Sequence, residues 1–459
     1  MQTKPSPPQV SGGLPILGHA VEFHRTPNDI MNRGYREHGP LFSFKLANQN
    51  VAVLAGVEHQ RTFFAKTDKG LNIQKPYTFL QAMFGDALFL APHDKYLEQR
   101  PMVTELFRRK KMLEYIDIMQ EQVQKMVDGW GDSGEIELTG AINHLVQEVA
   151  GSCFLGKDLH AQVGREFWDH YAVLGAALDP LLPPHWPLPK FIKRDRAKAQ
   201  MKQILRPIIA ERRANPDRYD DMIKDMVVYA NELGEAITDD TILNLLLGLM
   251  FAGHETTAGQ GAWSVIQLLQ HPSYLALVQE EIDTHTTAGE RFDHRTMAKL
   301  KHVAQAVRET ERMKPSAEFL MRVVEEPLEI GDYVVPEGWL TLVSADVAHH
   351  LEEIWQEPDR YDPMRFSPER AEDKQDRFTL IGFGGGTHKC TGMNFANNEM
   401  IIIVTLLFQQ FDLELVTQDP QVNRDTGTCR PEKTIVRYKR KAAGGATKPV
   451  DEGALAVAS

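Results

Sequence analysis

The spacing of apolar residues along the chain predicts a mainly α-helical protein with small β-sheets. Between about residues 95 and 310, apolar positions recur at helical spacing. Short runs typical of strands occur at 41–45 and 51–54, between 321 and 342, and at 434–438, with Gly- and Pro-containing turn signals beside them. Because strands and helices do not alternate regularly, a parallel α/β sheet is not expected.

One long helix is predicted from Asp239 to Gln270. Thr238 is suited to cap its N-terminus, acidic residues follow in the first turn, and Pro272 marks its end. At 1.5 Å per residue such a helix is about 45–50 Å long. Its first half is apolar on nearly every side, which predicts a central, buried position.

The end of the chain has a different composition. From Ala442 to Ser459 it is rich in Ala and Gly and has no apolar periodicity. We expect a flexible linker or tail after a single domain that spans residues 1–441.

Composition and charge exclude several classes of protein. The net charge of -12 over 459 residues argues against a nucleic-acid-binding protein. Three cysteines are too few for a disulfide scaffold and are typical of a reducing compartment. The N-terminus has no apolar signal-peptide core, and the longest apolar stretches, near 242–252 and 400–408, are shorter than the roughly 20 residues of a membrane span. These features predict a soluble, cytoplasmic protein without a transmembrane anchor.

The strongest chemical signal is the glycine-rich run from Phe383 to Gly392. Three adjacent glycines, beginning at Gly384, would let the backbone approach a flat ligand and adopt unusual dihedral angles. Cys390 is expected at the start of the helix that follows, where free N–H groups and the helix dipole favour a thiolate. This placement, together with a bound metal, would make the sulfur anionic at neutral pH.

The residues of this run allow three other interpretations. Cys390 could be an ordinary buried cysteine. His388 and Cys390 could form half of a zinc site, although no second Cys/His pair has suitable spacing. The glycines and Lys389 could form a phosphate loop, but Cys stands where that motif needs Ser or Thr.

The run resembles the haem-binding signature F-x-x-G-x-[R/H]-x-C-x-G of the cytochromes P-450. Three further motifs of that superfamily occur in the expected order: 252–257 resembles the oxygen-activating segment, 309–312 the E-x-x-R motif, and 363–366 the P-x-R-F motif. The resemblance extends from about Gly13 to Arg440. It implies a P-450 fold, haem b bound through the thiolate of Cys390, Phe383 and Gly384 in the cofactor loop, and O2-dependent monooxygenase activity.

The oxygen-activating segment has a direct chemical interpretation. Ala252 is small and leaves room for O2 beside a flat cofactor, and Glu255 could supply the acid for proton delivery. Thr256 could offer its hydroxyl to the oxygen instead of bonding back within its own helix. The alternative is that Glu255 and Thr256 are simply polar residues on an outer face.

The two remaining motifs suggest a structural role. Glu309 and Arg312 alone are an ordinary i,i+3 helix pair. We expect Arg365 to join them in a buried ion network that holds the loop carrying Cys390.

Within the superfamily the chain is most similar to the bacterial sterol 14α-demethylases, in the segments 77–85, 96–100, 320–322 and 435–439. The resemblance implies that the haem propionates are held by Tyr77, Arg100, Arg322 and His388. It also implies that a lanosterol-like sterol loses its 14α-methyl group as formate in three successive oxidations. Candidate pocket residues are the apolar Phe79, Phe84, Ala252, Ala317 and Phe319.

One position departs from the sterol demethylase pattern. Most members carry His directly before the threonine of the oxygen segment, whereas this chain carries Glu255. A monooxygenase acting on a fatty acid or terpenoid therefore remains an alternative. A non-catalytic haem sensor or carrier is a further alternative from another class, although it would need no acid next to Thr256.

The electrons must come from another protein or domain. The sequence has no flavin or nucleotide motif and too few cysteines for an iron–sulfur cluster. The basic run Arg108–Lys111 and Lys389 predict a docking site for an acidic ferredoxin, although such a run is often only a solvated helix end. Some bacterial sterol demethylases continue through an Ala/Gly-rich linker into a fused ferredoxin, so we expect a ferredoxin-type donor that is either a separate protein or fused to this haem domain through the linker.

Overall fold

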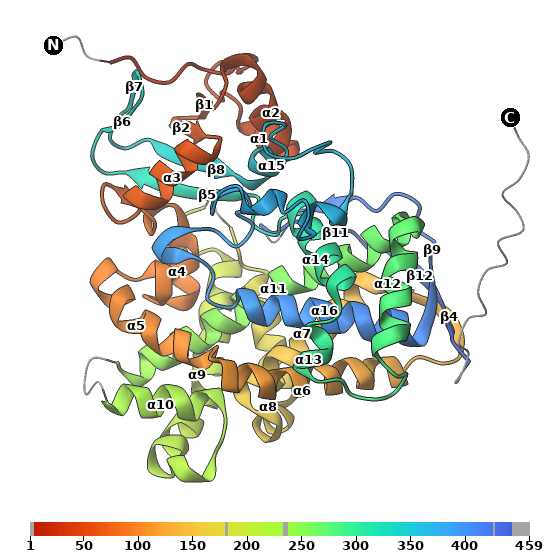
Figure 1. The fold of residues 1–459 in the computed structure, drawn as a ribbon. Helices are drawn as coiled ribbons and strands as arrows, with labels where there is room; N and C mark the ends of the chain where they lie inside the picture. Colours follow the sequence, from red (N-terminus) through yellow and green to blue (C-terminus); the bar gives the residue numbers. More distant parts are fainter. Residues whose placement is uncertain (1–3, 180–181, 233–236, 426, 443–459) are drawn as a thin grey trace, which may run out of the picture.

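The computed structural model describes residues 4–179, 182–232, 237–425 and 427–442 (Figure 1). The predicted tail therefore lies, apart from Ala442, outside the described residues. The α-helices are α1 (Ala20–Arg25), α2 (Pro27–His38), α3 (Val57–Lys66), α4 (Thr78–Phe84), α5 (His93–Leu106), α6 (Arg109–Asp128), α7 (Leu138–Ala150), α8 (Lys157–Gly175), α9 (Pro189–Ala214), α10 (Met222–Glu232), α11 (Asp239–Gln270), α12 (Pro272–His285), α13 (His294–Met297), α14 (Lys301–Met313), α15 (Ala345–His349) and α16 (Met393–Gln410).

The strands form small sheets, as the sequence predicts. They are β1 (Leu41–Leu46), β2 (Gln49–Leu54), β3 (Leu71–Asn72), β4 (Ser133–Glu137), β5 (Phe319–Val324), β6 (Leu328–Ile330), β7 (Tyr333–Val335), β8 (Leu340–Ser344), β9 (Phe411–Leu415), β10 (Val422–Asn423), β11 (Arg430–Pro431) and β12 (Ile435–Arg440). The predicted fold class, mainly α with small β-sheets, is confirmed. Strand β4 interrupts the region 95–310, which is otherwise mainly helical, as expected.

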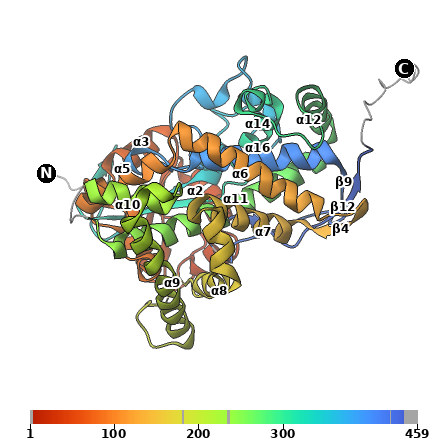
Figure 2. The ribbon, with the colours of Figure 1, turned by 90° about the horizontal axis from the view of Figure 1, so that it is seen from below.

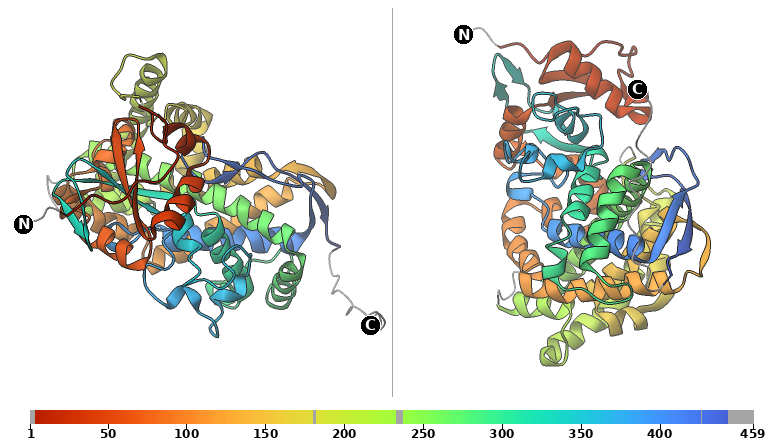
Figure 3. Two further views of the ribbon diagram at one scale, coloured as in Figure 1. Left: turned by 90° about the horizontal axis from the view of Figure 1, so that it is seen from above. Right: turned by 45° about the vertical axis from the view of Figure 1, so that its right-hand side comes forward.

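The largest sheet has the strand order β1-β2-β8-β5-β3. Strand β8 runs parallel to β2, and β5 runs antiparallel to β8 with Met321 opposite Leu342. This sheet and the N-terminal helices lie to one side of the helical part of the molecule, as Figures 1 and 3 show. The sheet β4-β12-β9 lies at another edge of the molecule.

Helix α11 runs through the middle of the helical part, with the bounds that the sequence predicts (Figure 2). Its N-cap is Thr238, whose side chain accepts a hydrogen bond from the N–H of Thr241. It packs against α7, α14 and α16, and its first half is buried from Ile242 to Met250 except for Asn244 and Gly248. The helix that follows the cysteine loop, α16, thus packs directly on α11.

Among the described residues, no helix is long and apolar enough to cross a membrane.

Candidate haem site

The loop that precedes α16 carries Cys390, three residues before the helix begins. The backbone N–H of Cys390 donates to the carbonyl of Phe383 at 3.0 Å, which closes the loop on itself. Gly384 and Gly386 have φ angles of 68° and 65°, a region that favours glycine. A Cβ at Gly384 would meet nothing nearer than 3.9 Å, so this part of the loop presents bare backbone with space in front of it. The loop therefore has the shape expected of a cradle for a flat ligand.

The thiol of Cys390 is exposed in the structure. Desolvation by the surrounding protein raises its pKa, and the hydrogen bond from the N–H of Gly392 opposes that effect only in part. The loop alone therefore favours a neutral thiol, since the helix begins three residues later than the sequence suggested. A metal is needed to make the sulfur anionic, and a thiolate is a strong ligand for iron.

Behind the loop, Glu309, Arg312 and Arg365 meet in one ion network in which all three side chains are fully buried. The carboxylate of Glu309 pairs with Arg312 Nε at 2.8 Å and with Arg365 Nε at 3.1 Å. Arg365 also pairs with Glu372 at 2.8 Å. The structure thus brings together the three residues of the predicted network.

His349 connects this network to the cysteine loop, and no sequence motif pointed to it. Its Nδ1 bonds the carbonyl of Arg312 at 3.0 Å, and its Nε2 accepts the N–H of Ile381 at 2.9 Å. Burial lowers the pKa of His349 to about 3, so the ring is neutral and can accept at Nε2. No local sequence pattern marks His349, because its two hydrogen-bond partners are 32 and 37 residues away in the sequence.

Glu311, inside the E-x-x-R motif, is a second group that the sequence did not single out. It is buried against Gly382, where a Cβ would lie 2.7 Å from Glu311 Oε1. Burial raises the pKa of this carboxyl from 4.5 to about 7, although Arg308 and Lys389 oppose the shift.

This shift predicts that the stability of the protein falls as pH rises from about 5 to 8. The folded state keeps the Glu311 proton up to a higher pH than the unfolded state, so its contribution is complete below about pH 4.5 and is lost through about pH 7. We expect Glu311→Gln to gain about 3 kcal/mol over the parent at pH 8 and almost nothing at pH 5. Urea unfolding at the two pH values measures the difference. An equal gain at both would contradict the assignment.

The predicted propionate anchors come from four separate segments. Arg322, in the middle of β5, is buried, and no carboxylate of the described residues lies within ion-pair distance of it. Burial lowers its pKa, since its charge has no direct counter-ion. The hydroxyl of Tyr77 accepts the N–H of Met321, the neighbour of Arg322, at 3.1 Å. A buried cation beside a hydroxyl suits a ligand with carboxylate groups.

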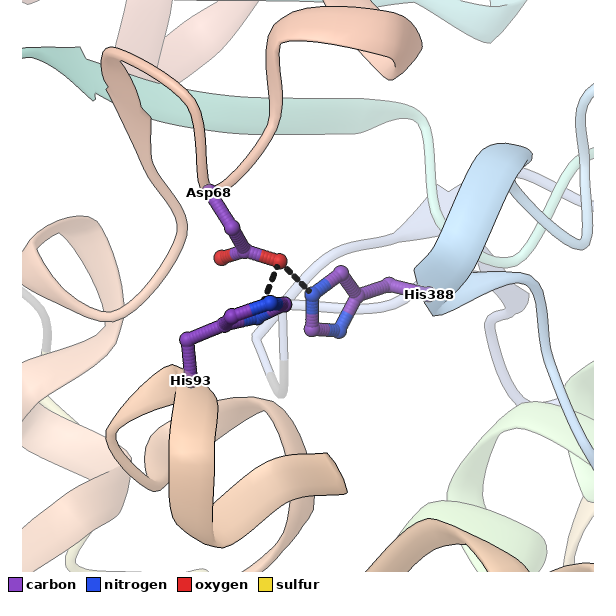
Figure 4. A group of neighbouring side chains, drawn as sticks. All are labelled: Asp68, His93 and His388. Atoms are coloured by element: carbon purple, nitrogen blue, oxygen red, sulfur yellow. Dashed lines mark hydrogen bonds and ion pairs between the residues drawn. The ribbon is translucent and has the colours of Figure 1, made fainter.

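The other two anchors, Arg100 and His388, both contact Tyr96. Arg100 hydrogen bonds the Tyr96 hydroxyl, and its Nη2 donates to the carbonyl of Lys389 at 3.1 Å. The ring of His388 stacks on Tyr96 at 4.1 Å, and its Nε2 lies 2.6 Å from Asp68 Oδ2 (Figure 4). The Nδ1 of His388 is buried without a protein partner. The orphaned imidazole nitrogen and the two guanidinium groups fit a dicarboxylate cofactor such as haem b.

On α11, the hydroxyl of Thr256 bonds back to the carbonyl of Ala252 at 2.7 Å. The hydroxyl is therefore bonded within its own helix in the structure, although the sequence suggested that it would be free of it. Its oxygen can still accept a hydrogen bond. Glu255 is half-buried and pairs through Oε2 with Arg430 Nη1 at 3.2 Å, and its other oxygen lies 3.8 Å from His254 Nδ1.

The candidate pocket residues do not all lie together. The ring of Phe84 is buried and packs on Phe251 of α11 at 5.0 Å, and Ala252 is exposed one residue further on. Phe79 and Ala317 are half-buried. Phe319 instead packs on Phe23 of α1 at 5.5 Å, on the opposite face of β5 from Leu320, which approaches Gly384. Phe319 is therefore removed from the candidate set.

The basic run at the start of α6 is only partly available to a partner. Lys111 is mostly buried and pairs with Asp220 at 2.6 Å, with further acids near it. Arg108 pairs with Glu105, while Arg109, Lys110 and Lys389 are exposed. Successive residues of a helix point in different directions, so a run in the sequence did not become one patch.

Comparison with known proteins identifies the family. A sequence profile for cytochrome P-450 matches residues 7–437. A sterol 14alpha-demethylase of Mycolicibacterium vanbaalenii is 31% identical over 446 residues, which cover 95% of this chain and 98% of that protein. A lanosterol 14-alpha demethylase of Bos taurus is 30% identical over 453 residues, which cover 95% of this chain and 88% of that protein. The solved structure of retinoic acid bound cyanobacterial CYP120A1, 24% identical, has the same fold, with a TM-score of 0.86 over 96% of this chain and 100% of that chain.

The chain therefore belongs to the cytochrome P-450 family. It has the P-450 fold, uses haem b, and is a monooxygenase that needs O2 and a redox partner.

Proposed function

We propose that this P-450 removes the 14α-methyl group of a lanosterol-like sterol, as formate, in three successive O2-dependent oxidations. The observation that supports this most is the match of 95% of the chain, at 31% and 30% identity, to two proteins named as sterol and lanosterol 14-demethylases. The segment 77–85, on which the sterol resemblance rests, forms α4 and packs against α11 through Phe84 and Phe251. An apolar lining there would suit a sterol body.

In this proposal the thiolate of Cys390 would hold the haem iron, and a haem held in this way would supply the activation of O2. Arg322 and His388, together with Arg100 and Tyr77, hold the two propionates. Glu309, Arg312 and Arg365 do not touch the cofactor. They keep the cysteine loop in place through His349.

Glu255 and Thr256 are proposed to deliver protons beside Ala252. Thr256 donates to the carbonyl of Ala252, which is exposed, and its oxygen remains able to accept a hydrogen bond. Glu255 is the nearest acid in sequence, and Arg430 holds its carboxylate in place. General acid assistance is typically worth about 10²–10⁴ in rate.

We expect Thr256→Ala to bind haem and substrate nearly normally but to divert reducing equivalents into hydrogen peroxide. The substitution removes the hydroxyl that is proposed to take part in proton delivery, but it leaves the substrate and haem pockets in place. The measurement is product formed per electron pair consumed. Thr257→Ala, at the buried next position, controls for the loss of a threonine from α11. Unchanged coupling in Thr256→Ala would count against the role.

The electron donor is proposed to be a ferredoxin, either separate or fused through a linker at residues 442–459, with residues 1–441 as the haem domain. The exposed Arg109, Lys110 and Lys389 are its proposed docking cations. A tether would raise its effective concentration.

Charge reversal at Arg109 and Lys110 should slow reduction by ferredoxin and flatten its salt dependence. Stopped-flow reduction at two ionic strengths measures both. Reversal of the exposed Lys433 and Lys439, at the three-stranded sheet, is the matched control and should have little effect. Equal effects of the two pairs would place the docking site elsewhere.

Optical titration of the ferric enzyme tests the substrate class. Lanosterol should displace the iron-bound water and change the spectrum at micromolar concentration, with a smaller response to a fatty acid or terpenoid. A response to a fatty acid alone would favour the alternative substrate.

A further inference from the structure

We infer that the turn between α3 and β3 positions two haem anchors at once, with Thr67 holding Arg322 and Asp68 holding His388. The inference rests on the proposed haem site and is independent of the sterol proposal. Arg322 and His388 belong to segments 66 residues apart, and this turn contacts both of them.

The turn has a backbone that fixes its side chains. Thr67 caps the end of α3, and its hydroxyl donates to the carbonyl of Phe63 at 3.0 Å. Asp68 has a φ of 64°, in the left-handed region that residues other than Gly seldom adopt, and its N–H donates to the carbonyl of Leu71 at 2.8 Å. A non-glycine residue kept in this conformation suggests that its side chain has a task.

One carboxylate oxygen of Asp68 contacts two histidines. Its Oδ2 lies 2.6 Å from His388 Nε2 and 3.0 Å from His93 Nδ1, as Figure 4 shows. Asp68 and His388 have side chains only 9% and 6% exposed, whereas His93 is 46% exposed. The stack on Tyr96 fixes the ring plane of His388. With Nε2–H donating to Asp68, the buried and unpartnered Nδ1 is the atom left for a haem carboxylate, to which it can donate only when the ring carries a hydrogen on both nitrogens.

Thr67 and its helix hold Arg322 in a similar way. The Nε of Arg322 donates to Thr67 Oγ1 at 3.2 Å, and its guanidinium lies over the ring of Phe63 at 4.8 Å. Its Nη1 donates to the carbonyl of Met321 at 2.7 Å. These contacts fix the direction of the group and leave its charge for a ligand, since no described carboxylate pairs with it.

Because Thr67 and Asp68 are adjacent, a single turn sets the distance between the two anchors. Thr67 and Asp68 are therefore positioning residues, which act on the cofactor through Arg322 and His388. Partners of this kind typically change the affinity of a bound group by about 10–100-fold when removed.

Transfer of haem from the holoenzyme to excess apomyoglobin tests the inference. Asp68→Gly removes the carboxylate and suits the positive φ, and Thr67→Val removes the hydroxyl at similar volume. We expect haem loss to accelerate about tenfold or more in Asp68→Gly, less in Thr67→Val, and by about the product of the two in the double variant. His93→Gln, which removes only the exposed partner, and Asp376→Asn, which breaks the exposed pair with Arg61, should stay within about twofold of the parent.

The same substitutions in a protein that lacks the His388 side chain distinguish a positioning role from a general loss of stability. In a His388→Ala protein, Asp68→Gly should add much less than in the parent, only the loss of its attraction to Arg322, whereas Thr67→Val should still accelerate haem loss in full. If Asp68→Gly accelerates loss equally with and without His388, the inference is overturned. If His388→Ala itself leaves haem loss unchanged, the anchor assignment fails instead.

Asp68, His93 and His388 could also bind a divalent cation, because their ligand atoms lie within 4.8 Å of one another. Stoichiometric zinc in the purified enzyme that disappears in His93→Gln would overturn the positioning role and make Asp68 a metal ligand.

Discussion

Replacing Cys390 by Ser is expected to abolish the red-shifted Soret band of the reduced carbon monoxide complex, together with monooxygenase activity. A serine hydroxyl lacks the electron donation of a thiolate. The measurement is the difference spectrum of the reduced protein with and without carbon monoxide.

The other cysteines provide the control for this prediction. Cys153 and Cys429 are both buried, and burial raises the pKa of each thiol. Cys153→Ser and Cys429→Ser should therefore keep the band. A Cys390→Ser protein that retained it would contradict the assignment of the ligand.

Glu309→Gln is expected to destabilise the protein by about 3–5 kcal/mol or to prevent haem incorporation. The change leaves the fully buried Arg312 without a carboxylate partner and leaves Arg365 with Glu372 alone, and an unpaired buried charge is costly. Urea unfolding of the holoenzyme and the haem content of the purified protein measure the effect.

An exposed pair of the same spacing is the matched control. Arg360 and Glu357 are also an i,i+3 pair, but their side chains are 67% and 66% exposed. Glu357→Gln should cost less than about 1 kcal/mol. If the two substitutions cost the same, burial is not what makes the Glu309 network important.

The elements that the sequence predicted correctly carry local signals. Helix α11 has its predicted bounds because Thr238 caps one end and Pro272 begins the next helix. The cysteine loop was identifiable because its glycines and Cys390 are contiguous. The three members of the Glu309 network were found because each belongs to a short motif.

The features that the sequence did not predict depend on contacts between distant segments. His349 and Asp68 contact the cysteine loop across 32 and 320 residues, so no local spacing marks them. Lys111 belongs to a basic run but is neutralised by acids of another segment. The Thr256 hydroxyl follows the i−4 geometry of its own helix, which the functional motif does not reveal.

The assignment of substrate class rests on relatives that are about one-third identical, and turnover tests it most directly. The purified enzyme is supplied with a ferredoxin, its reductase and lanosterol labelled in the 14α-methyl group. The account predicts one labelled formate for each sterol demethylated, with three O2 consumed. Hydroxylation of a fatty acid or terpenoid under the same conditions, with the sterol left intact, would contradict it.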